Sequence, residues 1–234
     1  MSEFSRMALM LGQEAVDKMA RAHVAVFGVG GVGGACVEAL VRAGLGELSI
    51  FDADAVSLSN INRQIIALHS TIGRKKVEVV RERAMDINPH IIVHANDVFY
   101  DADTAGAYPL SAYDYVVDAI DTVSSKLLLA ENAGDTPLLC CLGTGNHLDP
   151  SRFRITPIEK TSVCPLARVM RKACKARGIH GLRVLWSDEP PLIPKDTPSE
   201  KGRHLPGSVS FTPPVAGYLL AAEVVRELCG IYIS

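Results

Sequence analysis

The chain has 234 residues, a formal net charge of -2 and a hydrophobic fraction of 48 %, which fits one globular α/β domain with a full core. No apolar run approaches the ~20 residues that a membrane span needs, and the opening MSEFSRM is too polar for a secretory signal. The six cysteines show no disulfide spacing, so we expect a cytoplasmic protein with no membrane segment.

Helices and strands are expected to alternate along the first two thirds of the chain. A helical arm is predicted over residues 5–20. Strands are predicted at 24–27, 47–51, 91–95, 114–118 and 137–141, and helices at 33–43, 74–86, 101–107 and 123–134. This alternation predicts an α/β fold, with a mostly parallel sheet and helices on both faces.

The pattern changes after residue 145. A strand at 152–155 is expected to pair antiparallel with one at 182–186, around a basic helix at 165–177, as a small C-terminal extension. Proline and charge are frequent over 187–206, which predicts a mobile loop, and a last helix is expected over 212–228. We therefore divide one domain, 1–234, into an arm (1–22), a core (23–145) and a substrate-binding extension (146–234).

The most informative motif follows the first predicted strand. Its glycines are Gly28, Gly30, Gly31 and Gly33, in the order G-x-G-x-x-G with one addition. Small residues permit a tight turn and a close approach of backbone to phosphate, and the helix N-terminus attracts anions. Asp52 lies about twenty residues beyond, where a ribose hydroxyl is held in Rossmann-like folds. The core is therefore predicted to be Rossmann-like and to bind a nucleotide.

A cluster of polar and basic residues follows Asp52 and argues against a dehydrogenase. Its members are Asn60, Arg63, Gln64 and Lys76. Hydride transfer needs no phosphate chemistry, whereas adenylation must neutralise the charge of leaving pyrophosphate with Arg or Lys. The pattern therefore indicates a nucleoside triphosphate and transfer of its adenylate.

Asp121 ends the run DYVVDAID, at the carboxyl edge of a predicted buried strand. Ligands of open α/β sheets bind at this edge, and magnesium takes one or two carboxylates together with phosphate oxygens. We therefore expect Asp121 to hold Mg²⁺. The alternative is that Asp121 only caps the helix predicted at 123–134.

The set GVGGVG, DAD, LSNINRQ, Lys76 and DAID resembles the adenylating family of the ubiquitin-activating enzymes and the activators of sulfur-carrier proteins. Within that family, FSRMALMLG, KTSVCPLARVMRKACKARGI and GSVSFTPPVAG are similar to the branch of tRNA threonylcarbamoyladenosine dehydratases. The resemblance implies that ATP activates the threonylcarbamoyl carboxylate on a tRNA adenosine next to the anticodon, which then cyclises with loss of water. The alternative is adenylation of the C-terminal glycine of a ubiquitin-like carrier protein. A non-enzymatic ATP-sensing module is a third reading, and it would leave the phosphate-contacting residues without a purpose.

The resemblance also implies roles for individual residues. It places Asp52 at the ribose with Asp54 beside it, Asn60, Arg63, Gln64 and Lys76 at the phosphates, and Asp121 at Mg²⁺. It further implies a homodimer in which Arg6 reaches the ATP of the partner subunit. Arg6, Arg63, Lys76 and Asp121 are therefore the expected catalytic residues. A sulfur-transfer or carrier protein is a possible further partner.

Cysteine usage departs from parts of this family. Paired C-x-x-C zinc ligands do not occur, so we expect no structural zinc. The segment 205–217 contains no cysteine, so no nucleophilic thiol is expected there. Cys164 fits either a site residue or a small apolar filler at a helix start. Cys140 and Cys141 are expected to fill the core, and Lys126 to contact phosphate or lie in solvent.

Charge is distributed unevenly along the chain. Residues 1–151 carry 11 basic and 19 acidic residues, whereas 152–183 carry nine basic residues against Glu159 alone. Such a segment is typical of a phosphate-binding patch, although a solvated helix face is the alternative. We therefore expect the extension 146–234 to bind tRNA.

Overall fold

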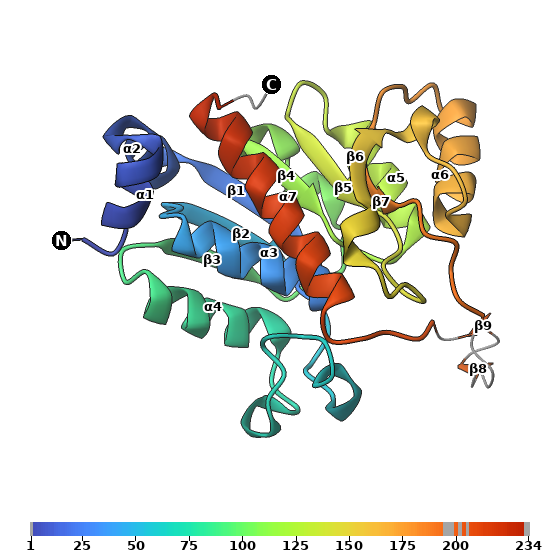
Figure 1. The fold of residues 1–234 in the computed structure, drawn as a ribbon, viewed down its shortest axis with the longest axis horizontal. Helices are drawn as coiled ribbons and strands as arrows, with labels where there is room; N and C mark the ends of the chain where they lie inside the picture. The colour runs from blue at the N-terminus through green and yellow to red at the C-terminus, as the bar shows by residue number, and fades with distance from the viewer. Residues whose placement is uncertain (1, 194–198, 201–202, 205, 232–234) are drawn as a thin grey trace.

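The computed structural model describes residues 2–193, 199–200, 203–204 and 206–231, built on a seven-stranded sheet of order β3-β2-β1-β4-β5-β7-β6 (Figure 1). The strands are β1 (His23–Phe27), β2 (Glu47–Phe51), β3 (Ile92–Asn96), β4 (Tyr115–Asp118), β5 (Leu138–Cys141), β6 (Phe153–Pro157) and β7 (Arg183–Ser187). Neighbouring strands pair in parallel except β6 and β7. The predicted mostly parallel α/β fold is confirmed.

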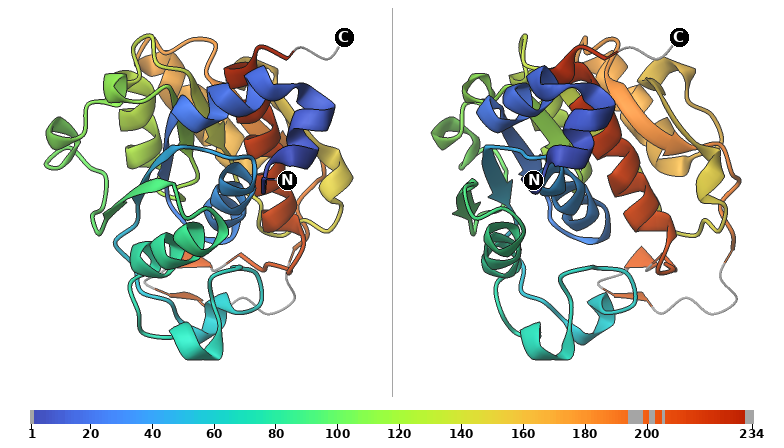
Figure 2. Two further views of the ribbon diagram at one scale, coloured as in Figure 1. Left: turned by 90° about the vertical axis from the view of Figure 1, so that its left-hand side faces the viewer. Right: turned by 60° about the vertical axis from the view of Figure 1, so that its left-hand side comes forward.

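Helices cover both faces of the sheet (Figures 1 and 2). They are α1 (Ser5–Leu11), α2 (Gln13–Arg21), α3 (Gly31–Arg42), α4 (Lys76–Ile87), α5 (Val123–Asn132), α6 (Pro165–Ala176) and α7 (Thr212–Cys229). The largest apolar cluster joins α3, α4 and α7 to one face through residues such as Leu40, Val80 and Leu220. A second cluster packs α5 and α6 against the other face. In the described part of the chain, no helix is long and apolar enough to cross a bilayer.

Two predicted elements differ from the structure. The arm is two helices because Gly12, with φ 85° and ψ 160°, interrupts the helical geometry. The helix predicted at 101–107 is wrong, since only Ala105–Ala107 forms a 3₁₀ turn. This segment forms a turn because the Asp101 carboxylate accepts hydrogen bonds from the backbone N–H groups of Asp103 (3.0 Å) and Thr104 (3.1 Å). Such side-chain contacts favour a turn over a helix.

The antiparallel pair β6 and β7 is confirmed, and it extends the main sheet, because β7 lies parallel to β5. The predicted mobile loop 187–206 falls partly outside the described residues, at 194–198, 201–202 and 205. Its described part includes a short hairpin of β8 (Ser199–Glu200) and β9 (Arg203–His204). Mobility of this loop stays a prediction.

The strand order reverses between β1 and β4, and the loops after these strands touch each other there. The Ala119 N–H donates to the Phe27 carbonyl (2.8 Å), and a Cβ at Gly28 would lie 2.8 Å from the Ala119 oxygen. Gly28 also has φ 84°, which favours glycine. A Cβ at Gly33 would lie 1.8 Å from the Gly28 oxygen, so the loop and the first turn of α3 need both glycines. Open α/β sheets bind ligands at such a reversal.

Gly33→Ala should therefore destabilise the protein by about 1–3 kcal/mol or more, because the loop backbone must move away from the new methyl group. Urea unfolding measures this change. Gly106→Ala is the matched control, since its Cβ would meet nothing within 4 Å, and it should change stability by less than about 0.5 kcal/mol. Equal effects of the two substitutions would contradict the packing role of Gly33.

Candidate nucleotide-binding site

A cavity of about 630 Å³ opens at the carboxyl ends of the strands, beside the reversal between β1 and β4. Ten of the residues predicted for the site line it: Gly28, Gly30, Gly31, Asp52, Asp54, Asn60, Arg63, Gln64, Lys76 and Asp121. Gly33 and Arg6 are not among the lining residues. Gly33 packs behind the loop, against the Gly28 carbonyl. Arg6 lies on α1, and Phe4, which precedes this helix, packs against Gly44 beyond the C-terminus of α3.

Asp52 fixes the glycine loop to the end of β2. One carboxylate oxygen accepts the Val29 N–H (2.9 Å), and the other accepts the Asp54 N–H (2.9 Å). Burial raises the pKa of Asp52, while the nearby Lys76 ammonium opposes this shift. Asp52 therefore holds the loop in shape in addition to facing the cavity.

Lys76, the first residue of α4, points its ammonium group at two carboxylates. Its Nζ lies 2.6 Å from an Asp54 oxygen and 3.7 Å from an Asp52 oxygen. The Lys76 side chain is 7 % exposed, whereas that of Asp54 is 73 % exposed. An anion entering the cavity would compete with Asp54 for this cation, since Asp54 can turn outward into solvent.

Asn60, Arg63 and Gln64 lie on the turn that follows β2. The Asn60 side-chain oxygen accepts the Ser57 N–H (3.1 Å), and Arg63 donates to the Ser59 carbonyl (3.0 Å). Gln64 is buried, and its Oε1 has no hydrogen-bond partner within the described residues. Because buried polar atoms are almost always paired, this unpaired acceptor at the cavity wall is suited to receive a hydrogen bond from a bound molecule.

Asp121 is exposed at the edge of the cavity and accepts a hydrogen bond from the Thr122 hydroxyl (3.3 Å). The residue preceding α5 is Thr122, and this helix has no side-chain cap. The alternative reading of Asp121 as a helix cap therefore finds no support in the structure. Its carboxylate is available to a cation in the cavity.

A buried ion pair lies beneath the cavity, and the sequence did not predict it. Lys126 and Asp118 are both 0 % exposed, with Nζ 3.1 Å from each carboxylate oxygen. Lys126 also donates to the Cys141 carbonyl (2.6 Å), and Asp118 accepts the Ile120 N–H (3.1 Å). The expectation of a solvated or phosphate-bound Lys126 is wrong. This residue instead joins the ends of β4 and β5 and, through Asp118, shapes the loop that carries Asp121.

The adjacent cysteines belong to the same buried region. The Cys140 thiol donates to an Asp118 carboxylate oxygen (2.8 Å), and burial raises the pKa of Cys140. Cys141 is 3 % exposed, and its residue borders the cavity. Burial raises the pKa of Cys141 to about 12, so neither thiol is a thiolate near neutral pH.

The outer wall of the cavity comes from residues that were not predicted for the site, although Leu166, Gly207 and Ser208 lie in the family-like segments 160–179 and 207–217. The wall residues are Phe99 and Tyr100 after β3, Gly143 to Gly145 after β5, Leu166 at the start of α6, and Pro206 to Ser208. Asn146 bonds to both backbone groups of Gly207 (2.7 and 2.9 Å), and Asn62 donates to the Ser208 carbonyl (3.1 Å). The segment 206–208 is therefore attached across the cavity from two sides.

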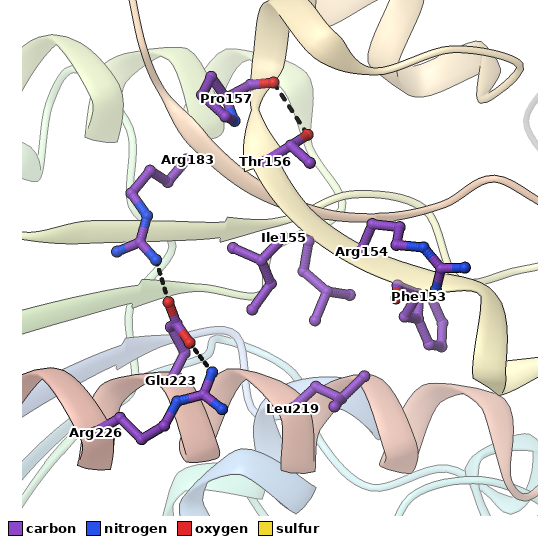
Figure 3. Close-up of a pocket in the computed structure, with 10 residues that line it drawn as sticks. Phe153, Arg154, Ile155, Thr156, Pro157, Arg183, Leu219, Glu223 and Arg226 are labelled. Atoms are coloured by element: carbon purple, nitrogen blue, oxygen red, sulfur yellow. Dashed lines mark hydrogen bonds and ion pairs between the residues drawn. The ribbon is translucent and has the colours of Figure 1, made fainter. Parts of the chain in front are cut away.

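A second hollow, of about 480 Å³, lies between β6 and α7 (Figure 3). Arg183 pairs there with Glu223 and Glu227, and Glu223 also pairs with Arg226. The described residues that line this hollow include neither a glycine nor the first turn of a helix, so its cations have no geometry suited to a triphosphate.

The structure divides the basic segment into paired and exposed charges. Four of its nine cations form ion pairs: Arg152 and Arg154 with Asp188, Arg177 with Glu131, and Arg183 with the glutamates of α7. Arg171 instead bonds to the Thr161 carbonyl and hydroxyl. Arg168, Lys172 and Lys175 are exposed and have no ion-pair partner in the described part of the chain. Their spacing of four and three residues places them on one stripe of α6.

Comparison with known proteins identifies the family. The ThiF family model matches residues 4–233. The chain belongs to the ThiF family. It is 39 % identical over 239 residues to the tRNA threonylcarbamoyladenosine dehydratase of Bacillus subtilis (strain 168), a match that spans 97 % of this chain and 94 % of the relative.

A solved structure and a second relative complete the comparison. The E. coli tRNA N6-threonylcarbamoyladenosine dehydratase TcdA, solved in complex with ATP, superposes with a TM-score of 0.88 at 31 % identity, covering 97 % of this chain and 94 % of that one. The molybdopterin-synthase adenylyltransferase of Escherichia coli (strain K12) is 40 % identical over 124 residues, which is 53 % of this chain and 47 % of the relative. Similarity along nearly the whole chain therefore extends to the dehydratases, and similarity to this adenylyltransferase covers about half.

Lys126→Met should destabilise the protein by about 3–5 kcal/mol, because the Asp118 charge would stay buried without its partner. The double variant Asp118→Leu/Lys126→Met should recover part of this loss, since no charge is then left unpaired. Urea unfolding of both variants measures the difference. Lys172→Met, on the exposed face of α6, is the control. If Lys126→Met were as stable as this control, the buried Asp118–Lys126 pair would not have the stabilising role proposed for it.

Proposed function

We propose that this chain is an ATP-dependent tRNA threonylcarbamoyladenosine dehydratase. One observation supports this most strongly: ten residues from separate segments meet around a single cavity, in a chain similar to the dehydratases along nearly its whole length. Activation of a carrier-protein glycine is the second candidate, supported by the similarity to the molybdopterin-synthase adenylyltransferase over about half the chain.

The cavity suits ATP as a substrate. The N-terminus of α3 lies in the glycine loop, where its free N–H groups can bind phosphate. The unpaired Oε1 of Gln64 offers an acceptor for an N–H or O–H group of the nucleotide, and its amide N–H groups can donate to phosphate. Asp52 is assigned to the ribose, with Asp54 beside it. The triphosphate is assigned to Asn60, Arg63, Gln64 and Lys76.

Asp121 fits a role as the protein ligand of Mg²⁺. Its exposed carboxylate lines the same cavity as the phosphate-binding candidates, and no helix cap engages it. Bound magnesium would supply positive charge next to the phosphates. No other described carboxylate of the cavity is as accessible without an ammonium partner, since Asp52 and Asp54 both face Lys76.

In the proposed reaction the carboxylate of the threonylcarbamoyl group attacks the α-phosphorus of ATP, and pyrophosphate leaves. Arg63 and Lys76 balance the charge that develops on the leaving group. The mixed anhydride then reacts with an atom of the same carbamoyl group, so a ring closes and AMP departs. Because the attacking atom is already held close, the enzyme needs no nucleophile of its own. Cys164 accords with this, since it is 3 % exposed and accepts the Ala167 N–H (3.5 Å) at the start of α6.

Arg6 is assigned to the active site of a partner subunit in a homodimer. The Phe4 ring packs against Gly44, just beyond the C-terminus of α3, whereas the N-terminus of α3 borders the cavity. The length of α3 separates these two ends by about 18 Å. Leu9 and Met10 on the same short helix are 87 % and 85 % exposed, an apolar surface that a second copy would cover.

The exposed stripe of α6 is assigned to tRNA phosphates. The first turn of α6 borders the cavity at Leu166, and the stripe runs from there along the helix. A tRNA held along α6 can therefore bring one nucleoside to the cavity. Lys160, also exposed, adds a fourth cation of the basic segment.

Exchange of labelled pyrophosphate into ATP tests the choice of substrate. We expect exchange to depend on tRNA carrying threonylcarbamoyladenosine, because only that carboxylate fits the proposed reaction. The control is the same tRNA without the modification. Exchange driven only by a small protein ending in diglycine would contradict the dehydratase and support the second candidate.

Mixing two inactive variants tests the role of Arg6. Arg6→Ala and Asp121→Asn homodimers should each lose most exchange, roughly 100-fold or more per lost charge. After subunit exchange, half of the dimers are mixed and one site in each is intact, so activity should return to about a quarter of the wild-type rate. No recovery despite mixed dimers seen by native mass spectrometry would contradict action across the interface.

Charge reversal on α6 tests the tRNA surface. Four phosphate contacts predict that a plot of log tRNA affinity against log salt concentration has a slope of about -3. The triple variant Arg168→Glu/Lys172→Glu/Lys175→Glu should lose most of this salt dependence. The KM for ATP should stay unchanged, since these side chains are not among the cavity residues. Arg21→Glu, exposed on α2, is the control. Unaltered salt dependence in the triple variant would place the tRNA elsewhere.

A further inference from the structure

Two histidines and a glutamate meet near the end of the sheet opposite the nucleotide cavity. His23 begins β1, Glu47 begins β2, and His94 lies at the centre of β3. The register pairs His23 with Glu47 and Ser49 with His94, so the three side chains come from adjacent strands. One nitrogen of each ring and one carboxylate oxygen all lie within 4.8 Å of one another. We propose that His23, Glu47 and His94 bind a divalent transition-metal ion of the zinc class.

The distances suit a shared metal ion after small side-chain movements. Glu47 Oε1 lies 2.8 Å from His94 Nε2 and 3.5 Å from His23 Nδ1. Bonds of about 2.0–2.1 Å at tetrahedral angles place neighbouring ligand atoms about 3.4 Å apart. The separation from His23 is close to this value, and the separation from His94 must lengthen by about 0.6 Å. Rotation of the half-exposed His94 ring can provide this change and bring the two nitrogens together.

The ligand types select the metal. Imidazole nitrogen together with one carboxylate oxygen suits Zn²⁺, Cu²⁺ or Ni²⁺, whereas Mg²⁺ prefers oxygen ligands alone. The side chains of His23, Glu47 and His94 are 19 %, 36 % and 49 % exposed, so an ion can enter from solvent. Three protein ligands leave the fourth tetrahedral position to water.

A second layer of contacts orients His23. Its Nε2 lies 2.9 Å from the Ser49 hydroxyl, which leaves Nδ1 directed at Glu47. The His23 and Tyr113 rings pack edge to face with a centroid distance of 4.9 Å, and the backbone N–H of His23 donates to the Asp114 carboxylate (2.8 Å). Metal-bound histidines are commonly held in this way through their other ring nitrogen.

A metal at this position would join the edge strand β3 to β2 and β1, on the side of the sheet away from the proposed chemistry. We therefore expect the bound metal ion to raise the stability of the fold and not to take part in the proposed reaction. It would also revise the expectation of no structural zinc, which rested only on the absence of paired cysteines. These three ligands are 24 residues or more apart in sequence, so no motif marks them.

Calorimetric titration of the untagged protein with Zn²⁺ tests the site, together with thermal unfolding. We expect one ion per chain and a higher Tm in Zn²⁺, with no such response to Mg²⁺. His94→Gln and, separately, Glu47→Gln should lower Zn²⁺ affinity at least tenfold, in line with the loss of one ligand.

His180→Gln, an exposed histidine on the loop after α6, is the matched control and should bind as the wild type does. Unfolding without metal shows whether each variant keeps its fold, and Glu47→Gln preserves the shape of the side chain. No saturable Zn²⁺ binding by the wild type would overturn the proposal. Unchanged binding in both ligand variants would overturn it as well, since the ion would then occupy the buried cysteines or another site.

Discussion

The contact between the loops after β1 and β4 is the constraint on which the site depends. Gly28 lies so close to the backbone of Ala119 that a side chain would not fit between them. This contact occurs where the strand order reverses, and it brings the glycine loop and the loop bearing Asp121 to one cavity. Asp52 secures the first loop from β2, while the buried Asp118–Lys126 pair secures the second from below.

Most polar groups of the cavity are held by protein partners in the absence of substrate. Asn60 and Arg63 bond to the backbone of their own turn, and Lys76 faces Asp54. Such positioning reduces the reorganisation needed when charge develops on a leaving group, which is where catalytic electrostatics gains most. The Lys76–Asp54 pair differs from the other contacts, because Asp54 faces the ammonium group that the triphosphate is proposed to use. Substrate binding would therefore displace one exposed carboxylate rather than rebuild the site.

The sequence predicted those features that depend on local pattern. Buried strands and the G-x-G-x-x-G turn identified the parallel sheet, and residues in short motifs proved to line one cavity. The helix predicted at 101–107 was wrong because one side chain, Asp101, decides the outcome there, and the predicted helical arm is interrupted only at Gly12. It also missed Lys126, because its partner Asp118 and the Cys141 carbonyl approach it only in the folded chain. The basic count over 152–183 was informative, but only the structure separates paired cations from the stripe on α6.

The central claim is that this chain uses ATP to dehydrate a threonylcarbamoyl group on tRNA. Mass spectrometry of nucleosides tests it most directly, after the protein is incubated with ATP, Mg²⁺ and tRNA carrying threonylcarbamoyladenosine. We expect this nucleoside to lose the mass of one water while AMP and pyrophosphate form in equal amounts. An unchanged nucleoside would contradict the central claim, and AMP attached to the C-terminus of a carrier protein in a parallel incubation would support the alternative substrate.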